Sequence, residues 1–165
     1  MRSIPDPGFA GDDGATSPAL ARALDAYDAR PDDLHPATLA VLQRTRLLVP
    51  VVAVLGEVEY DDRGLAHDKT SDMATVLIEG RDGRTALLAF TSTEAMRRWD
   101  PTARPVPVSV ATTAESALRD GASAVVVDVA GPVMFVVETE DLQELAAGHV
   151  LVQVSDRFGW ATPAR

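Results

Sequence analysis

The sequence contains no cysteine, which excludes disulfides, thiolate catalysis, zinc ribbons and cysteine-ligated iron–sulfur clusters together. Aromatic residues are also scarce: they make up 5% of the 165 residues, whereas hydrophobic residues of all kinds make up 46%. We therefore expect a core built mainly from valine, leucine and alanine, a composition that suits buried strands. A chain of this length is expected to fold as one domain.

Basic residues are few, with 15 Lys and Arg against 25 Asp and Glu, so the net charge is −10. Nucleic-acid backbones and anionic membrane surfaces attract clustered Lys and Arg, and we expect neither as a partner. The acidic surface favours a basic protein partner instead. The sequence leaves the oligomeric state open, a homo-oligomer included.

Long hydrophobic runs are missing as well. The longest, "LLVPVVAVL" (47–55), is much shorter than a membrane span. The opening "MRSIPDPGFAGDDG" lacks the apolar segment of a signal peptide, so the expected location is cytoplasmic. Residues 1–16 are rich in Pro, Gly and Asp, and they predict a flexible N-terminal arm before a single domain over 17–165.

Helix signals recur along the chain. Ser17 and Pro18 fit the N-cap and first position of one helix, and a second helical pattern runs over 36–45. Thr91 with Glu94, and Thr112 with Glu115, fit the capping box at the start of two more helices. Gly121 and Gly148 fit the position just after a helix end.

Apolar runs alternate with these helical patterns, which indicates an α/β fold. Asp82-Gly83 between the runs 73–80 and 84–90 is a strong β-hairpin signal. The predicted fold is a mixed sheet of about five to seven strands with helices packed on it, containing one β-hairpin (73–90). Pro50 within its strand predicts an edge position or a bulge, and the tail after 149 can add a last strand.

The loop over 56–73 concentrates carboxylates between two apolar strands, and oxygen ligands of this kind suit hard cations. Its candidate metal ligands are Glu59, Asp61, Asp62 and His67. The order of a calcium-binding loop is missing, however, and one histidine is too few for a typical zinc site. A solvated acidic loop is therefore the favoured interpretation, and we expect no metal and no cofactor.

The segment "KTSDM" in the same loop places Lys69, Ser71 and Asp72 just before a strand, where a loop can present them at a sheet end. A lysine beside a serine serves nucleophilic catalysis when the lysine is desolvated. Neither a G-x-S-x-G nor an S-x-x-K motif is present, so an aspartate that caps a turn is the favoured alternative.

A second candidate site follows the strand that ends in "LLAF". Thr91 and Ser92 form a hydroxyl-rich turn, and Asp128 follows "VVV", where open α/β sheets place ligands. If this turn binds a ligand, free N–H groups at the helix start and the Ser92 hydroxyl are expected to meet a small anionic group. Trp99 lies three residues after Met96 on one helical face, which favours core packing over a partner-binding hot spot.

Several phrases in fixed order, "FAGDDG", "LLVPVVAV", "DKTSDMATVLIEGRDGRTALLAFTS", "RWDPTARPVPV" and "VVVDVAGPVMFVVE", resemble the actinobacterial branch of the SseB family, of the enhanced-serine-sensitivity type. The resemblance is to its N-terminal domain, and it implies an α/β domain without a catalytic assignment. Residues that match the recurrent phrases are Lys69, Ser71, Asp72, Met73, Asp82, Gly83, Phe90, Thr91, Ser92, Trp99, Pro105, Asp128, Gly131 and Pro132.

The leading hypothesis is a non-enzymatic, cytoplasmic binding or regulatory module of the SseB type with a protein partner. Its working face would combine the 57–72 loop, the Thr91-Ser92 turn and Asp128. The alternative is a small-molecule-binding protein or an enzyme. It would use the same loop and turn to bind, or to act on, an anionic or amino-acid-related ligand. These two hypotheses differ in whether the candidate side chains converge on a pocket.

Overall fold

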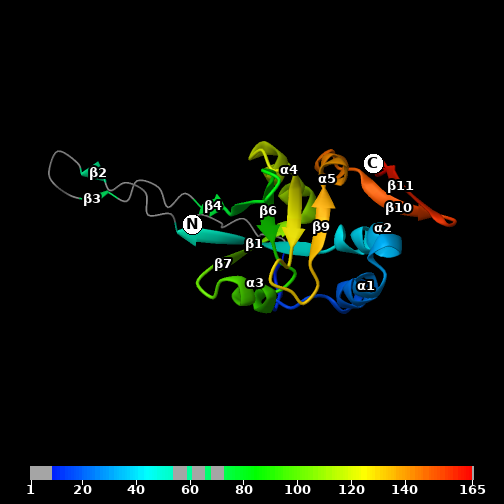
Figure 1. Ribbon diagram of the computed structural model, residues 1–165, viewed down its shortest axis with the longest axis horizontal. Coiled ribbons are helices and arrows are strands. Elements are labelled where there is room, and N and C mark those ends of the chain that lie inside the picture. Colours follow the sequence, from blue (N-terminus) through cyan, green and yellow to red (C-terminus); the bar gives the residue numbers. More distant parts are fainter. Residues whose placement is uncertain (1–8, 54–58, 61–65, 68–72, 165) are drawn as a thin grey trace.

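The computed structural model describes residues 9–53, 59–60, 66–67 and 73–164 (Figure 1). The helices are α1 (Pro18–Ala29), α2 (Pro31–Leu42), α3 (Thr93–Trp99), α4 (Val110–Arg119) and α5 (Thr139–Ala146). The strands are β1 (Arg46–Ala53), β2 (Glu59–Tyr60), β3 (Ala66–His67), β4 (Met73–Thr75), β5 (Leu77–Glu79), β6 (Thr85–Ala89), β7 (Arg104–Ser109), β8 (Ala124–Val127), β9 (Phe135–Glu138), β10 (Val150–Val154) and β11 (Arg157–Ala161). Within the described ranges, no helix has the length and apolar character needed to cross a membrane.

Two sheets form the centre of the molecule. The larger has the order β5-β6-β8-β9, with β6 and β8 parallel and the outer pairs antiparallel. The smaller, β4-β1-β7, is antiparallel, and a β-bridge between Leu48 and Phe90 joins it to the larger sheet. The predicted mixed α/β architecture is confirmed. The run 73–80 is divided at Val76, so that β4 pairs with β1 and β5 pairs with β6.

Pro50 lies in the middle strand of the smaller sheet, so the prediction of an edge or a bulge is wrong. On one side of β1 the Leu48 N–H donates to the Phe90 carbonyl at 2.8 Å. Further along the same side, β1 pairs with β4, beginning at Val51 and Thr75. Pro50 falls between these two partners, where its missing N–H leaves no ladder bond unmade.

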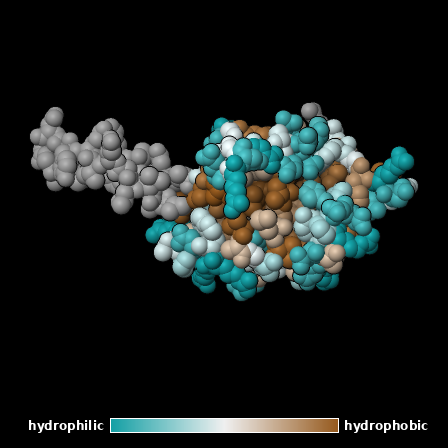
Figure 2. All heavy atoms as spheres, in the orientation of Figure 1, coloured by the Kyte–Doolittle hydropathy of each residue, from teal (hydrophilic) through white to brown (hydrophobic). Residues whose placement is uncertain are grey.

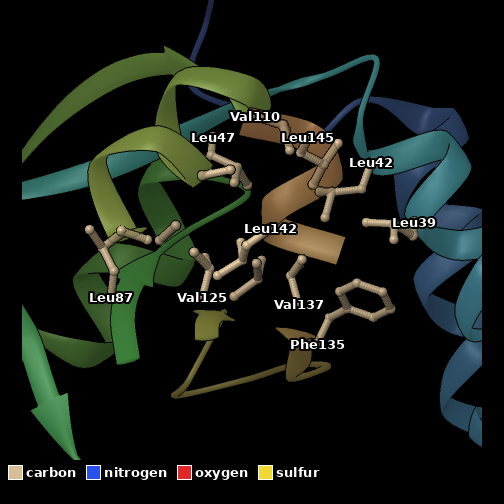
Figure 3. Packing of buried hydrophobic residues seen from close by; sticks show 14 of the residues in the cluster. Leu39, Leu42, Leu47, Leu87, Val110, Val125, Phe135, Val137, Leu142 and Leu145 are labelled. Atoms are coloured by element: carbon tan, nitrogen blue, oxygen red, sulfur yellow. The ribbon is translucent and has the colours of Figure 1, made fainter. Parts of the chain in front are cut away.

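The main core lies between one face of the larger sheet and helices α1, α2, α4 and α5. Figure 3 shows Val125 and Val137 from the sheet, Leu142 from α5 and Leu39 from α2 gathered around one interior. The opposite face of the sheet packs on α3 through a smaller cluster that includes Met96. Over strands β6, β8 and β9 this second face shows apolar residues at the surface (Figure 2). Aliphatic side chains thus supply most of both clusters, as the composition predicts.

Local chemistry explains several element boundaries. The Ser17 hydroxyl accepts the Leu20 N–H at 3.3 Å with Pro18 at the first helical position, as predicted. Gly121 and Gly148 adopt positive φ just after helix ends, also as predicted. Helix α2 begins at Pro31 and contains Pro36, so its predicted start was late by five residues.

The hairpin predicted at Asp82-Gly83 is confirmed. The Gly83 N–H donates to the Gly80 carbonyl at 3.0 Å, and the Gly80 N–H donates to the Arg84 carbonyl at 2.8 Å. Gly83 has a φ of 81°, which a residue with a side chain adopts only with strain. The turn therefore fixes the antiparallel register of β5 on β6.

Helix α2 covers the edges of two strands with polar groups. The His35 Nε2 atom lies 2.8 Å from the carbonyl of Val136 in β9, and the His35 ring stacks on Phe135 at 4.6 Å. The Gln43 amide forms two hydrogen bonds with the backbone of Leu151 in β10, at 2.7 and 2.8 Å. The last two strands therefore form a separate hairpin, attached to the body through α2 rather than added to a central sheet.

Candidate functional site

Thr91 and Asp128 meet at the ends of two parallel strands. Thr91 follows β6 and Asp128 follows β8, and parallel neighbours end at the same edge of a sheet. The Thr91 N–H donates to Asp128 Oδ1 at 2.8 Å, and the Thr91 hydroxyl donates to Asp128 Oδ2 at 2.7 Å. The topology thus brings together two of the residues singled out in the sequence.

Asp128 is held in an unusual environment for a carboxylate. It is 1% exposed, and its φ of 55° lies in the left-handed region. Burial raises the pKa of its carboxyl above the ordinary value, while the two hydrogen bonds from Thr91 act in the opposite direction. The Thr91 hydroxyl also accepts a hydrogen bond from Thr16 at 3.0 Å. Both groups are therefore engaged within the fold.

The capping-box predictions for Thr91 and Thr112 are wrong. Ser92 is the N-cap of α3, and its hydroxyl accepts the Ala95 N–H at 3.0 Å. Ser109 is the N-cap of α4, one turn earlier than predicted. In the first case the tertiary contact with Asp128 removes Thr91 from the cap, and the neighbouring hydroxyl takes its place.

Replacing Ser92 with alanine is expected to lower the free energy of unfolding by about 1 kcal/mol, because the Ala95 N–H loses its acceptor at the start of α3. Urea unfolding of the two proteins measures this difference. Replacement of Ser92 with aspartate, which also caps helices, is the control and is expected to keep most of the stability. Equal losses in both variants would contradict the capping role.

The N-terminal end of α3 offers few free donors to an anion. Besides the Ala95 N–H, the Thr93 N–H donates to the Gly14 carbonyl at 2.8 Å and the Met96 N–H donates to the Ser92 carbonyl. Gly14 fits closely here, since a Cβ atom on it would lie 2.3 Å from the Thr93 hydroxyl. The chain's own N-terminal segment thus occupies the place where an anionic ligand was expected.

A small pocket of about 170 Å³, here called the strand-end pocket, opens beside this contact. Its polar lining residues are Thr16, Asp25, Thr91, Ser92, Glu94, Arg98 and Asp128. Three of them are carboxylates, and the only guanidinium among them, Arg98, contacts Glu94 at 3.3 Å. The pocket is therefore small and predominantly acidic, which disfavours an anionic occupant.

Residues 9–17, the N-terminal segment, lie against the body through Arg46. The Arg46 guanidinium is bidentate with Asp12, at 2.6 and 3.0 Å, and donates to the carbonyls of Ala15 and Thr91. The Arg46 and Asp12 side chains are 11% and 20% exposed, and the hydrogen bond from Arg46 holds the pKa of the Asp12 carboxyl below its ordinary value. The expected boundary between arm and domain at residue 16 stays a prediction, but residues 9–16 are tied to the domain by these contacts.

One wall of a large groove is formed by this segment. The groove, called the N-terminal groove below, has a volume of about 1460 Å³ and is open to solvent. Its other walls are the beginning of α1, the end of α2 and the C-terminal hairpin. Apolar side chains line much of it, namely Phe9, Leu20, Val41, Leu151, Val152 and Phe158. Arg44, Arg46, Asp12 and Asp13 supply the charges at its surface.

The family model of the SseB protein N-terminal domain matches residues 20–144. The chain belongs to the SseB family. No curated protein and no solved structure matches the chain. The matched range contains the Thr91–Asp128 contact and helix α2, whereas the N-terminal segment and the C-terminal hairpin lie outside it. The groove of this SseB protein is thus bounded on two sides by elements that the family model does not include.

Several predicted site residues of this SseB domain lie outside the described residues: Lys69, Ser71, Asp72, Asp61 and Asp62. Glu59 and His67 are opposite each other in the β2–β3 ladder. In the described part of the chain, no three His, Asp or Glu side chains are grouped so that they could hold a metal ion. Whether the 57–72 loop takes part in binding stays a prediction.

Trp99 is half-buried on α3, and its ring lies 5.6 Å from that of Phe90. It packs with Met96 against the second face of the larger sheet, so the shared helical face predicted for the two residues is confirmed. This packing accounts for the position of Trp99 in the SseB domain without a partner.

Neither the role of Arg46 nor the N-terminal groove is predicted by the sequence. Arg46 directly precedes the apolar run 47–55, and its carboxylate partner Asp12 is 34 residues away. The sequence offers one signal, the two aspartates of the "GDDG" stretch. An acidic turn of this kind indicates a basic partner elsewhere in the domain, although the stretch lies in the predicted flexible arm. The walls of the groove come from three segments that are far apart in the sequence, so no local sequence pattern predicts the groove.

Proposed function

We propose that this SseB protein is a non-enzymatic binding module that holds a segment of a partner protein in the N-terminal groove. The observation that carries the proposal is the groove itself, whose volume of about 1460 Å³ is large. Small-molecule sites typically have volumes of about 300–1,000 Å³ and enclose their ligand. An open groove of greater volume with apolar walls is better matched to a peptide segment.

The chemistry of the occupant follows from the lining and from the whole chain. Phe9, Val41 and Phe158 offer apolar and aromatic surface, which suits apolar anchor side chains. The net charge of −10 attracts a segment with a positive net charge and accelerates its association. The proposed occupant is therefore a basic peptide segment with apolar anchors.

The contacts at the strand ends support a binding rather than a catalytic role. The Thr91 hydroxyl donates to Asp128 and accepts from Thr16, so it is committed to structure. Asp128 in turn has both oxygens engaged. We further propose that the protein acts in the cytoplasm without a cofactor. We also propose that it belongs to the actinobacterial branch of the family, which phrases such as "DKTSDM" and "RWDPTARPVPV" support.

The test uses a peptide selected from a displayed random library against the full chain. Ala19→Arg places a long side chain at an exposed position of α1 that lines the groove, and we expect it to weaken peptide binding at least tenfold, about 1.4 kcal/mol. Isothermal titration calorimetry measures both affinities. The selected peptides are also expected to carry a positive net charge.

Ala26→Arg is the matched control, because Ala26 is also exposed on α1 but does not line the groove. It changes the net charge by the same amount, so we expect a change in affinity of less than about twofold. Equal effects of the two substitutions, or a selection that yields no peptide, would contradict the proposed function. Thermal unfolding checks that both variants fold.

A further inference from the structure

Within the part of the chain that the structure describes, strand β11 has a strand partner on one side only. Among the described residues it pairs with β10 and with no other strand. Figure 1 shows the β10–β11 hairpin extending from the side of the molecule, beyond α2 and α5. The opposite edge of the hairpin is covered, because the Gln43 amide binds both backbone groups of Leu151. The β10 edge of the hairpin is thus occupied at Leu151, whereas the β11 edge, called the open edge below, has no strand partner among the described residues.

The direction of the backbone groups on the open edge follows from Gln43. Since the N–H and C=O of Leu151 point toward Gln43, Leu151 and its partner Trp160 form a non-hydrogen-bonded pair within the hairpin. The backbone groups of Trp160 therefore point away from β10. Those of Phe158, two residues earlier in the strand, point the same way. The open edge offers two N–H and C=O sets at the spacing that an extended strand requires.

We propose that β11 pairs antiparallel with β11 of a second copy of the chain, about a two-fold axis through Gly159. In this register Phe158 of one copy is opposite Trp160 of the other, and each such pair exchanges both backbone hydrogen bonds. Gly159 meets its counterpart on the axis in a non-hydrogen-bonded pair, where strands approach most closely. The two hairpins become one four-stranded sheet.

The side chains of β11 suit this self-pairing. Phe158 and Trp160 lie on the same face of the hairpin and are each half-buried against the main core. Pairing brings Phe158 of one copy beside Trp160 of the other, and cross-strand aromatic pairs are favourable. In the single chain an added Cβ on Gly159 would meet nothing within 4 Å, so the hairpin itself does not require glycine at this position. In the proposed pair, glycine leaves room at the axis, where the two strands approach most closely.

The hairpin carries no net charge, which favours it as the contact between two copies of a strongly acidic chain. Residues 150–161 contain one acid and one base, Asp156 and Arg157, although the whole chain carries a net charge of −10. Two copies therefore repel least where their hairpins meet. In the proposed register Arg157 is opposite Ala161 and Asp156 is opposite Thr162, so no like charges oppose each other across the contact.

The first test places a charge on the axis. Gly159→Lys is compatible with the single hairpin, because Gly159 has no positive φ and has open space around it. In the pair, two ammonium groups would be opposed across Cα atoms about 4.5 Å apart. In analytical ultracentrifugation we expect the wild-type chain to form a dimer by the time its concentration reaches about 100 μM. We expect Gly159→Lys to weaken dimerisation at least tenfold.

Val154→Lys is the matched control for charge. Val154 is 68% exposed on the same face of the hairpin, but it lies on β10, away from the axis. We expect this variant to dimerise like the wild type within about threefold. A wild-type chain that stays monomeric at about 100 μM, or equal weakening by both substitutions, would overturn the proposal. Neither position lines the N-terminal groove, so failure of this test is distinct from failure of the proposed function.

A second test does not depend on the lysine variant. Because the chain has no cysteine, Gly159→Cys introduces a single thiol. A non-hydrogen-bonded antiparallel pair has a Cα separation suited to a disulfide, so mild oxidation is expected to give a covalent dimer in high yield. Val154→Cys is expected to give little. Equal yields from the two variants would overturn the proposed axis.

Discussion

Replacing Arg46 with methionine is expected to lower the free energy of unfolding by about 2 kcal/mol. Methionine keeps part of the apolar stem but removes the guanidinium, which binds Asp12 and the carbonyls of Ala15 and Thr91. Asp12 keeps the Gly14 N–H as a donor to its Oδ1, but it loses the guanidinium, and a hydrogen bond to a charged group contributes about 1.5–3 kcal/mol. The loss is smaller than for a fully buried ion pair, because the Arg46 and Asp12 side chains are 11% and 20% exposed and keep some contact with water.

Urea unfolding of the wild type and variant measures this loss, with Arg44→Met as the matched control. Arg44 is an exposed arginine that lines the same groove, and its guanidinium has no hydrogen bond or ion pair with the described residues. We expect the control to lose less than about 0.5 kcal/mol. A loss below about 1 kcal/mol for Arg46→Met would show that the ion pair is not what stabilises this contact.

Arg46→Met should also act locally. Without the hydrogen bond from Arg46, the pKa of the Asp12 carboxyl is expected to rise toward its ordinary value, which NMR titration of the carboxyl resonance measures. The amides of residues 9–17 are expected to exchange faster with solvent, because the main tie of that segment is lost. Since this segment forms a wall of the N-terminal groove, binding of the selected peptide should weaken in parallel.

Asp128→Ala is expected to cost about 3 kcal/mol in the free energy of unfolding. The substitution leaves the buried Thr91 N–H without an acceptor, which costs about 1–3 kcal/mol. It also places alanine at a φ of 55°, which costs about 1–2 kcal/mol for a residue other than Gly, Asn or Asp. Asp128→Asn keeps an acceptor oxygen and tolerates this backbone, so it is expected to lose roughly half as much or less.

The same aspartate predicts a sign for pH dependence. Because burial raises the pKa of Asp128, the folded chain binds this proton more tightly than the unfolded chain does. The contribution of Asp128 is therefore fully present below the ordinary aspartate pKa and is lost as the pH rises through the raised value. The unfolding free energy of the wild type minus that of Asp128→Asn is expected to fall as the pH rises above about 4 and then to level off. A difference that grows with pH would contradict the raised pKa.

Signals confined to a few neighbouring residues were predictable from the sequence. Asp82-Gly83, Ser17-Pro18 and the glycines at 121 and 148 each determine a backbone conformation by themselves, and each was assigned correctly. The larger architecture also followed, because the alternation of apolar runs with helical patterns predicts a mixed sheet covered by helices. In these cases local preference and global fold agree.

Errors arose where a distant residue outcompetes a local partner. Thr91 with Glu94 fits a capping box, yet Asp128, 37 residues further on, takes both Thr91 donors. Arg46 resembles a strand terminus, and nothing near it in the sequence points to Asp12. The Thr91–Asp128 contact itself was half-predictable, because both residues follow apolar runs, but only the parallel pairing of β6 and β8 places them together.

Gln43 fixes the position of the β10–β11 hairpin, and it also affects how many copies of the chain could join through that hairpin. A sheet that is open at both edges is a template on which copies add without end, as they do in fibres. Here the side chain of Gln43, directly after α2, occupies one edge of the hairpin at Leu151, and pairing through β11 would use the other edge. A joined pair would then use both β11 edges and would carry Gln43 bound at Leu151 on each outer edge, which hinders the addition of further strands there. In the proposed dimer, one amide just after a helix would thus favour a finite pair over a fibre.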